Sequence, residues 1–207
     1  MNSMRKISRR SLAKGIAWTA PAMTMAIAAP AIASSTDPTV PADPAFDFAH
    51  GVKNPGNSCT NKACMPKDSY ATPVTITNPT AHPFIVEFLD YRLGVTSSSG
   101  TDGASDGVSS VGRTYSAGAQ LSCSTGSVPA CSPLPCQNAG GTTVNASRSV
   151  CIQPGQTLSF WVITGGLSGN SSNVPQYVSW RWIDATDCTV KNVGSAYSPD
   201  SSPNSAC

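Results

Sequence analysis

Residues 84–91, with the sequence FIVEFLDY, decide the fold of this chain. Alternate side chains of an extended strand point to opposite faces, and here both faces are apolar. A strand of this kind belongs in the middle of a sheet that is covered on both sides. Residues 157–164 (TLSFWVIT) have the same character and predict a second central strand. In residues 84–91 the predicted faces are Phe84, Val86 and Phe88 on one side and Ile85, Leu89 and Tyr91 on the other.

Short strands joined by turns are predicted on either side of these two segments. Residues 72–78 (TPVTITN) alternate, and residues 175–183 and 188–193 are apolar and rich in β-formers. Charged residues make up only 12% of the chain and Glu87 is its only glutamate, a composition that disfavours surface helices. The chain is therefore predicted to be all-β, a sandwich of about seven to nine strands with a long disulfide-stapled loop near residues 122–141.

Two turns carry a resemblance to a known family. Asn-Pro-Thr-Ala-His-Pro follows one strand at residues 78–83, and Pro-Gly-Gln-Thr precedes another at residues 154–157. An asparagine turn and a proline-glycine turn at such places resemble those of bacterial immunoglobulin-like surface domains, over about residues 70–93 and 150–193. The resemblance implies an immunoglobulin-like β-sandwich and a role at the cell surface.

The N-terminus is predicted to be an export signal. Residues 8–14 (SRRSLAK) resemble the bacterial twin-arginine motif, and an alanine-rich apolar segment leads to the small-residue cleavage site Ala31-Ile-Ala33. A general secretory signal is the alternative, and an uncleaved membrane anchor is disfavoured by the prolines within the segment. The whole leader resembles those of exported actinobacterial proteins. We expect a signal peptide at residues 1–33, a flexible linker at 34–44 and a single disulfide-rich β-sandwich domain at 45–207.

Removal of the leader changes the charge of the chain. The full sequence has 13 basic and 11 acidic residues, but five of the basic ones precede residue 15. The processed protein would therefore have a net charge of about −3, counted from 8 basic and 11 acidic residues. No basic patch indicates a nucleic-acid partner, and no stable membrane span is expected after cleavage.

All eight cysteines follow the predicted leader, and an even number in an exported protein indicates up to four disulfides. Zinc binding is disfavoured because Cys-x-x-Cys pairs and accompanying histidines are missing from the sequence. The pairing is not fixed by sequence, with a preference for Cys59–Cys64 and for Cys188–Cys207, which would hold the tail. The eight predicted disulfide cysteines are Cys59, Cys64, Cys123, Cys131, Cys136, Cys151, Cys188 and Cys207.

Residues that could support catalysis are few. There is no Gly-x-Ser-x-Gly elbow, and only His50 and His82 could serve as a base, with His82 expected to be solvated in a turn. Glu87 and Asp90 are three positions apart on one strand, so they are predicted to project to opposite faces and not to form a glycosidase pair. Glu87 is expected to form an ion pair or a polar edge of the sheet. Asp102 and Asp106 lie in a flexible loop without the spacing of a calcium hand, and no catalytic residue, metal or cofactor is predicted.

The most suggestive binding residues are the aromatic side chains Tyr177, Trp180 and Trp182. By alternation Trp180 and Trp182 share one face of their strand, with Tyr177 and Arg181 on the other. Exposed, these rings would stack on sugars, while buried tryptophans are equally typical of the core of such a sandwich. The core is the favoured interpretation for the two tryptophans, and Arg181 could stack on an aromatic neighbour.

The sequence thus predicts a secreted or cell-surface protein that acts by binding or as a structural element and not as an enzyme. Its expected partner is a protein or a cell-envelope glycan. A carbohydrate-binding module that uses its aromatic side chains is the alternative, and a secreted hydrolase with a site assembled from distant residues is a second one.

Overall fold

A computed structural model describes twelve parts of the chain, all within the unit formed by residues 32–207. The predicted leader, the first part of the predicted linker, Asp102, Asp106 and five of the eight cysteines (Cys59, Cys64, Cys123, Cys131 and Cys207) lie outside the described residues. The structure describes residues 39–53, 65, 68–95, 97–100, 104–105, 107–115, 121, 128, 134–137, 142–165, 174–199 and 204–205.

The described residues are almost entirely strands and turns, as a sequence poor in charged residues and rich in turn formers predicts. Two single-turn 3-10 helices, η1 (Phe48–His50) and η3 (Ala146–Arg148), accompany them. The strands are β1 (Ala45–Phe46), β2 (Val52–Lys53), β3 (Tyr70–Thr77), β4 (Phe84–Leu93), β5 (Ala104–Ser105), β6 (Val108–Thr114), β7 (Ser149–Ile152), β8 (Thr157–Thr164), β9 (Gln176–Asp184), β10 (Val190–Ser198) and β11 (Asn204–Ser205).

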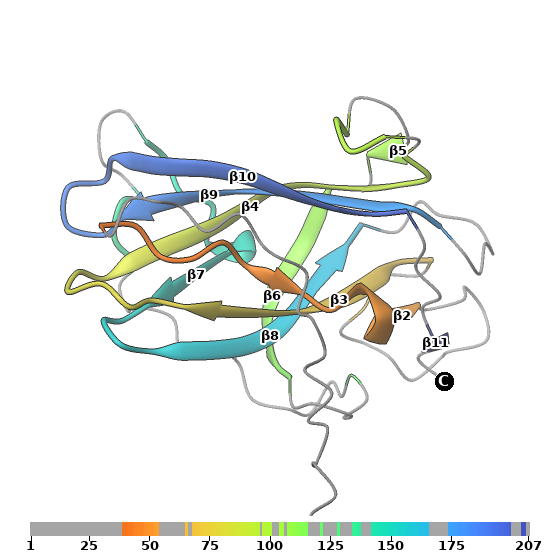
Figure 1. Cartoon of the computed structure of the whole chain (residues 1–207), viewed down its shortest axis with the longest axis horizontal. Helices are drawn as coiled ribbons and strands as arrows, with labels where there is room; N and C mark the ends of the chain where they lie inside the picture. Colours follow the sequence, from red (N-terminus) through yellow and green to blue (C-terminus); the bar gives the residue numbers. More distant parts are fainter. Residues whose placement is uncertain are drawn as a thin grey trace, which may run out of the picture. The chain divides into compact units, whose positions relative to one another are not determined.

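These strands form two sheets that pack as a sandwich (Figure 1). The six-stranded sheet has the order β11-β2-β3-β8-β6, with β1 beside β3; the five-stranded sheet has the order β10-β9-β4-β5, with β7 beside β4. The succession β1-β3-β8-β6 matches the A-B-E-D sheet of an immunoglobulin-type sandwich, and β10-β9-β4 matches its G-F-C sheet. The predicted fold class is therefore confirmed. Seven of the described strands have four or more residues, and four are two-residue strands.

Both predicted central strands are central. β4 has β9 on one side and β5 and β7 on the other, and β8 lies between β3 and β6. Their inner faces meet in the core between the sheets, where the rings of Phe88 and Phe160 lie 6.0 Å apart, edge to face. Their outer faces are covered as well. Trp161 and Ile163 pack with Met65 and Leu121 over the six-stranded sheet, and this second cover explains why both faces of β8 are apolar.

The predicted alternation of residues 84–91 is wrong at its end. Tyr91 was expected to face away from Phe84, but Tyr91 and Leu93 both lie in the core between the sheets. The cause is a β-bulge at Leu89, where the pairing of β4 with β9 shifts between Phe88 and Asp90. One extra residue in a strand exchanges the faces of all the residues that follow it.

The two predicted turns are confirmed, and they are bonded to each other. The side chain of Asn78 is buried, and its Nδ2 donates to the carbonyl oxygens of His82 at 2.7 Å and Ile152 at 3.3 Å. Its backbone N–H donates to the carbonyl of Gln156 at 2.9 Å, and its own carbonyl accepts from Gly155 N–H at 2.7 Å. Asn78 thus joins the turn after β3 to the turn before β8, on the neighbouring strand of the same sheet.

Among the described residues no helix is long and apolar enough to cross a membrane.

Candidate functional site

The outer face of strands β10, β9 and β4 carries a group of polar and aromatic side chains. Cross-strand pairing places Val193 opposite Arg181, Ser195 opposite Ser179 and Tyr197 opposite Tyr177. Residues directly opposite in an antiparallel pair lie on the same face of the sheet. We call this surface the outer face; it consists of Glu87, Asp90, Arg92, Tyr177, Ser179, Arg181, Val193, Ser195 and Tyr197.

The centre of the outer face is an ion-pair cluster around Glu87. Its Oε2 accepts from Nη2 of Arg181 at 2.6 Å, and its Oε1 accepts from Nε of Arg148 at 3.2 Å and from the N–H of Asn145 at 3.3 Å. Glu87 is only 1% exposed, while the two arginines are 24% and 33% exposed. The predicted ion pair of Glu87 is confirmed, and Arg181 binds this carboxylate.

Asp90 lies on the outer face too, so the predicted separation of Glu87 and Asp90 onto opposite faces is wrong. The bulge at Leu89 is again the cause, because it removes one step of the alternation between the two acids. Asp90 forms its own ion pair with Arg92, with Oδ2 2.5 Å from Nε. Both carboxylates therefore have guanidinium partners.

The three predicted aromatic residues separate into two groups. Trp180 and Trp182 are 2% and 0% exposed and lie in the core between the sheets, the favoured interpretation of the sequence. Tyr177 is half-buried on the outer face, where its ring lies against the backbone of Gly100. Gly100 has a φ of +61°, and a Cβ there would lie 2.5 Å from the tyrosine ring, so only glycine fits.

Tyr197 is a site residue that the sequence analysis missed. It lies directly opposite Tyr177 and is half-buried on the same face. The predicted last strand ended at residue 193, whereas β10 extends to Ser198. The available signal was the alternation of Val193, Ser195 and Tyr197, which is weak because serine and glycine interrupt its apolar pattern.

The histidines lie apart from this face in the chain's turns. His50 ends η1, and its Nδ1 lies 2.8 Å from Oδ2 of Asp47, with the two side chains 63% and 40% exposed. The side chain of His82 is exposed in the asparagine turn, as predicted, and its backbone carbonyl accepts the hydrogen bond from Nδ2 of Asn78. Across the described ranges, no group of three or more His, Cys, Asp or Glu side chains is placed to hold a metal ion.

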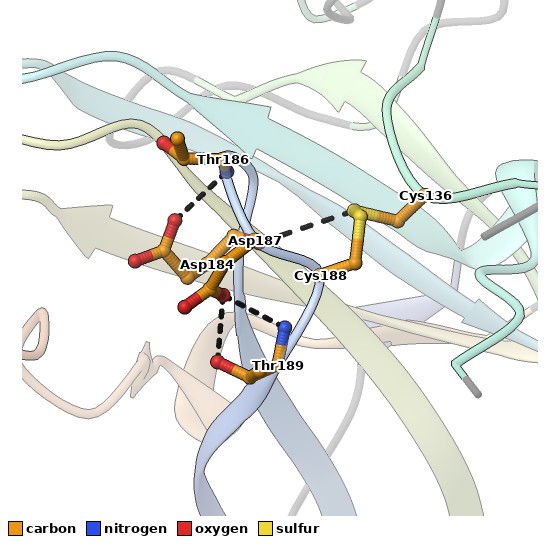
Figure 2. The surroundings of a disulfide bond; sticks show 6 residues. All are labelled: Cys136, Asp184, Thr186, Asp187, Cys188 and Thr189. Carbon is orange, nitrogen blue, oxygen red and sulfur yellow. Dashed lines mark hydrogen bonds between the residues drawn. A yellow bond between two sulfur atoms is a disulfide. The ribbon is translucent and has the colours of Figure 1, made fainter. Parts of the chain in front are cut away.

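A disulfide joins Cys136 to Cys188 at one end of the five-stranded sheet, with a Cα–Cα distance of 5.4 Å (Figure 2). The preferred pairing of Cys188 with Cys207 is therefore wrong. Cys136 packs on the outer side of this sheet in a small apolar cluster with Ile85, Val144 and Ile183. Cys188 packs against the same cluster, which brings the two sulfur atoms together. Cys151 is also disulfide-bonded.

The turn that carries Cys188 is held by its own polar residues. Asp187 accepts from the hydroxyl of Thr189 at 2.6 Å, from the Thr189 N–H at 2.9 Å and from Nζ of Lys191 at 2.9 Å. Figure 2 shows the Asp187–Thr189 contacts beside a second one, from Thr186 N–H to Asp184. These hydrogen bonds, the Thr189 hydroxyl first, lower the pKa of the Asp187 carboxyl to about 2.

Comparison with known proteins adds no family to this picture. No protein-family model matches the chain, and no curated protein matches it.

Proposed function

We propose that this chain is an exported, non-enzymatic protein of the bacterial cell exterior that binds a partner through the outer face. The observation that carries the proposal is the pair Tyr177 and Tyr197, two half-buried rings on neighbouring strands. Tyrosines with an apolar body and a polar tip are enriched where protein surfaces bind partners. The sandwich places them on a rigid support, because the core behind them is filled by Trp180 and other large side chains.

The charge arrangement also favours binding over chemistry. Glu87 and Asp90 are each paired with arginine, so the face offers guanidinium groups whose positions are fixed by carboxylates. Such groups donate planar hydrogen bonds to hydroxyl or carboxylate oxygens of a partner. Cysteines that form disulfides agree with an oxidising location outside the cytoplasm.

A carbohydrate-binding module is the second candidate, favoured by the same tyrosine pair beside Arg92 and Asp90. An aromatic ring and a neighbouring arginine-carboxylate pair supply the stacking and hydrogen bonds that sugars require. The two candidates differ in the chemistry of the partner. Purified cell-envelope glycans and surface proteins extracted from the same cells are therefore the two probes.

The test compares three forms of the processed protein against both probes. In Tyr197→Ala the ring is lost from the outer face, while Thr157→Ala removes an exposed side chain from the other sheet as a matched control. We expect binding to fall at least about tenfold for Tyr197→Ala and to be unchanged for the control. Saturable binding to glycan selects the carbohydrate-binding module, and saturable binding to a surface protein selects the protein-binding role. Equal binding by all three forms would exclude the outer face.

The export step has its own test. Replacement of both Arg9 and Arg10 by lysine should abolish export through the twin-arginine route and retain the protein inside the cell. Export that continues unchanged would assign the leader to the general secretory route. Retention of the wild-type chain inside the cell would overturn the proposed location.

A further inference from the structure

Strand β10 forms one edge of the five-stranded sheet, at the upper margin of the sandwich in Figure 1. Within the described part of the chain it pairs only with β9. From Asn192 to Ser198 the pairing is regular, and this stretch contains no charged residue and no proline. Its side chain Val193 is 62% exposed, the highest exposure among the large apolar residues that the structure describes.

The other sheet edges that the structure describes carry the devices that prevent edge-to-edge pairing. β6 ends the six-stranded sheet with two register shifts, between Val108 and Ser110 and between Val111 and Arg113. β1, β2, β5 and β11 are two-residue strands, and β7, which pairs with β4 at the other edge of the five-stranded sheet, has four residues against nine in β10. Short strands and bulges are the usual ways in which proteins protect an edge, and a long regular edge without them is a template for another strand. In β10 the one register shift lies at its start, between Val190 and Asn192.

From this contrast we infer that β10 pairs with β10 of a second copy of the chain. The two strands run antiparallel about a two-fold axis at Ser195, so that the five-stranded sheets of both copies become one. In this register Val193 of each copy lies opposite Tyr197 of the other, on the outer face. A β-branched residue opposite an aromatic one is a favourable cross-strand pair, and it covers the exposed valine. Such an interface is isologous, because each contact occurs twice.

Charge does not oppose this pairing. Two charged residues adjoin this stretch, and each already has a partner within its own copy. Lys191 Nζ lies 2.9 Å from Oδ2 of Asp187 in the same turn, and Oδ1 of Asp43 accepts from Nδ2 of Asn192 at 3.4 Å. Gly194 and Ala196 lie opposite each other on the inner face, so no large side chains collide there. An edge-to-edge contact is small, which predicts a reversible dimer of micromolar affinity or weaker whose population rises with concentration.

The position on the axis provides a sharp test. Ser195 is exposed in the single copy, so a charge there leaves the sandwich intact, but in the dimer it lies opposite itself. Two lysines directly opposite each other repel, and we expect Ser195→Lys to weaken dimerisation at least about tenfold in sedimentation equilibrium. Ser195→Asp should do the same, and an equimolar mixture of the two variants should restore a dimer. Thr157→Lys, on β8, adds the same charge on the other sheet as a control.

Each outcome decides the inference. A wild-type dimer that Ser195→Lys dissociates and the Lys–Asp mixture restores supports it, provided that near-ultraviolet circular dichroism shows both variants folded. A wild type that stays monomeric up to ~1 mM would overturn it. A dimer that persists in Ser195→Lys, or a mixture that stays monomeric, would exclude this register. The result does not depend on the proposed function, since neither export nor a foreign partner enters the measurement.

Discussion

Arg181 on β9 lies directly opposite Glu87 on β4, with Nη2 2.6 Å from Oε2 of the carboxylate. Glu87 is almost fully buried, and its other oxygen binds Arg148. This pair fixes the register of two neighbouring strands on a face where the alternation of β4 is interrupted by the bulge at Leu89. It also keeps the chain's only glutamate bound to two guanidinium groups.

Loss of Arg181 should therefore destabilise the protein more than loss of Arg148. Arg181→Ala leaves the buried carboxylate with weaker partners, and we expect the free energy of unfolding to fall by about 2 kcal/mol. Arg148→Ala should cost about 1 kcal/mol, because that arginine is more exposed and its contact longer. Guanidinium denaturation at pH 7 measures both values. Equal falls in the free energy of unfolding for the two variants would contradict a stronger contribution of Arg181 than of Arg148.

Asn78 should tolerate almost no substitution. In Asn78→Asp a carboxylate replaces the amide that donates to the carbonyls of His82 and Ile152, and we expect a loss of about 3 kcal/mol at pH 7. Part of this loss should return as the pH falls, because a protonated aspartate can donate one of the two bonds. Thr80→Ser keeps the hydroxyl that bonds Asn78 and serves as the control. Thermal unfolding at pH 7 and pH 4 compares the variants.

Gly194 should resist a larger side chain. A Cβ at this position would lie 2.7 Å from Cζ2 of Trp180, which is fixed in the core. Gly194→Val should therefore cost about 2 kcal/mol by overpacking and shift the fluorescence of the tryptophans. Ser195→Ala changes the neighbouring residue on the opposite face and should leave stability within about 0.5 kcal/mol of wild type. A stable Gly194→Val variant would contradict the close approach of β10 to Trp180.

The Cys136–Cys188 disulfide should stabilise the fold without being required for it. The core between the sheets contains no cysteine among the described residues, since Cys136, Cys151 and Cys188 all pack on the outer side of the five-stranded sheet. The bond spans 52 positions, so its removal should cost at most about 4 kcal/mol in chain entropy.

We expect the Cys136→Ser, Cys188→Ser double variant to keep the near-ultraviolet spectrum of the wild type while melting at a lower temperature. A core that forms without this bond would fit export of a folded, reduced chain, which the predicted twin-arginine route requires. Loss of the native spectrum at room temperature would contradict this.

Stability of the β9–β10 turn should depend on acid pH through Asp187. Its pKa lies near 2 in the folded protein, below the ordinary value of 3.8. Its contribution is therefore complete above about pH 4 and is lost as the pH falls through about 2. The carboxyl resonance of Asp187 in an NMR titration should report this pKa, and Thr189→Val should raise it toward 3.8, because the hydroxyl is its strongest donor. An unshifted resonance would contradict the turn's hydrogen bonds.

Local patterns predicted the central strands and both turns. The apolar runs of β4 and β8 require cover on both faces whatever the rest of the chain does, and Asn-Pro and Pro-Gly restrict the backbone within a few residues. The tryptophans were correctly favoured for the core. These features depend on neighbours in the sequence, and so they were readable from it.

The binding face was only partly predictable. Tyr177 was identified, but Tyr197 was not, because its relation to Tyr177 is a cross-strand pairing with no local signal. The joint location of Glu87 and Asp90 depends on the bulge at Leu89, and a single sequence does not mark where an extra residue enters a ladder.

By itself the sequence determined an all-β chain with two central strands, because burial on both faces and turn formation are encoded within short segments. Tertiary structure alone decided which residues from distant segments meet: Cys188 with Cys136, Arg181 and Arg148 with Glu87, and Tyr197 with Tyr177. The physical reason is that strand register and disulfide pairing depend on the balance of the whole packed sandwich, in which one bulge changes the face of every residue beyond it.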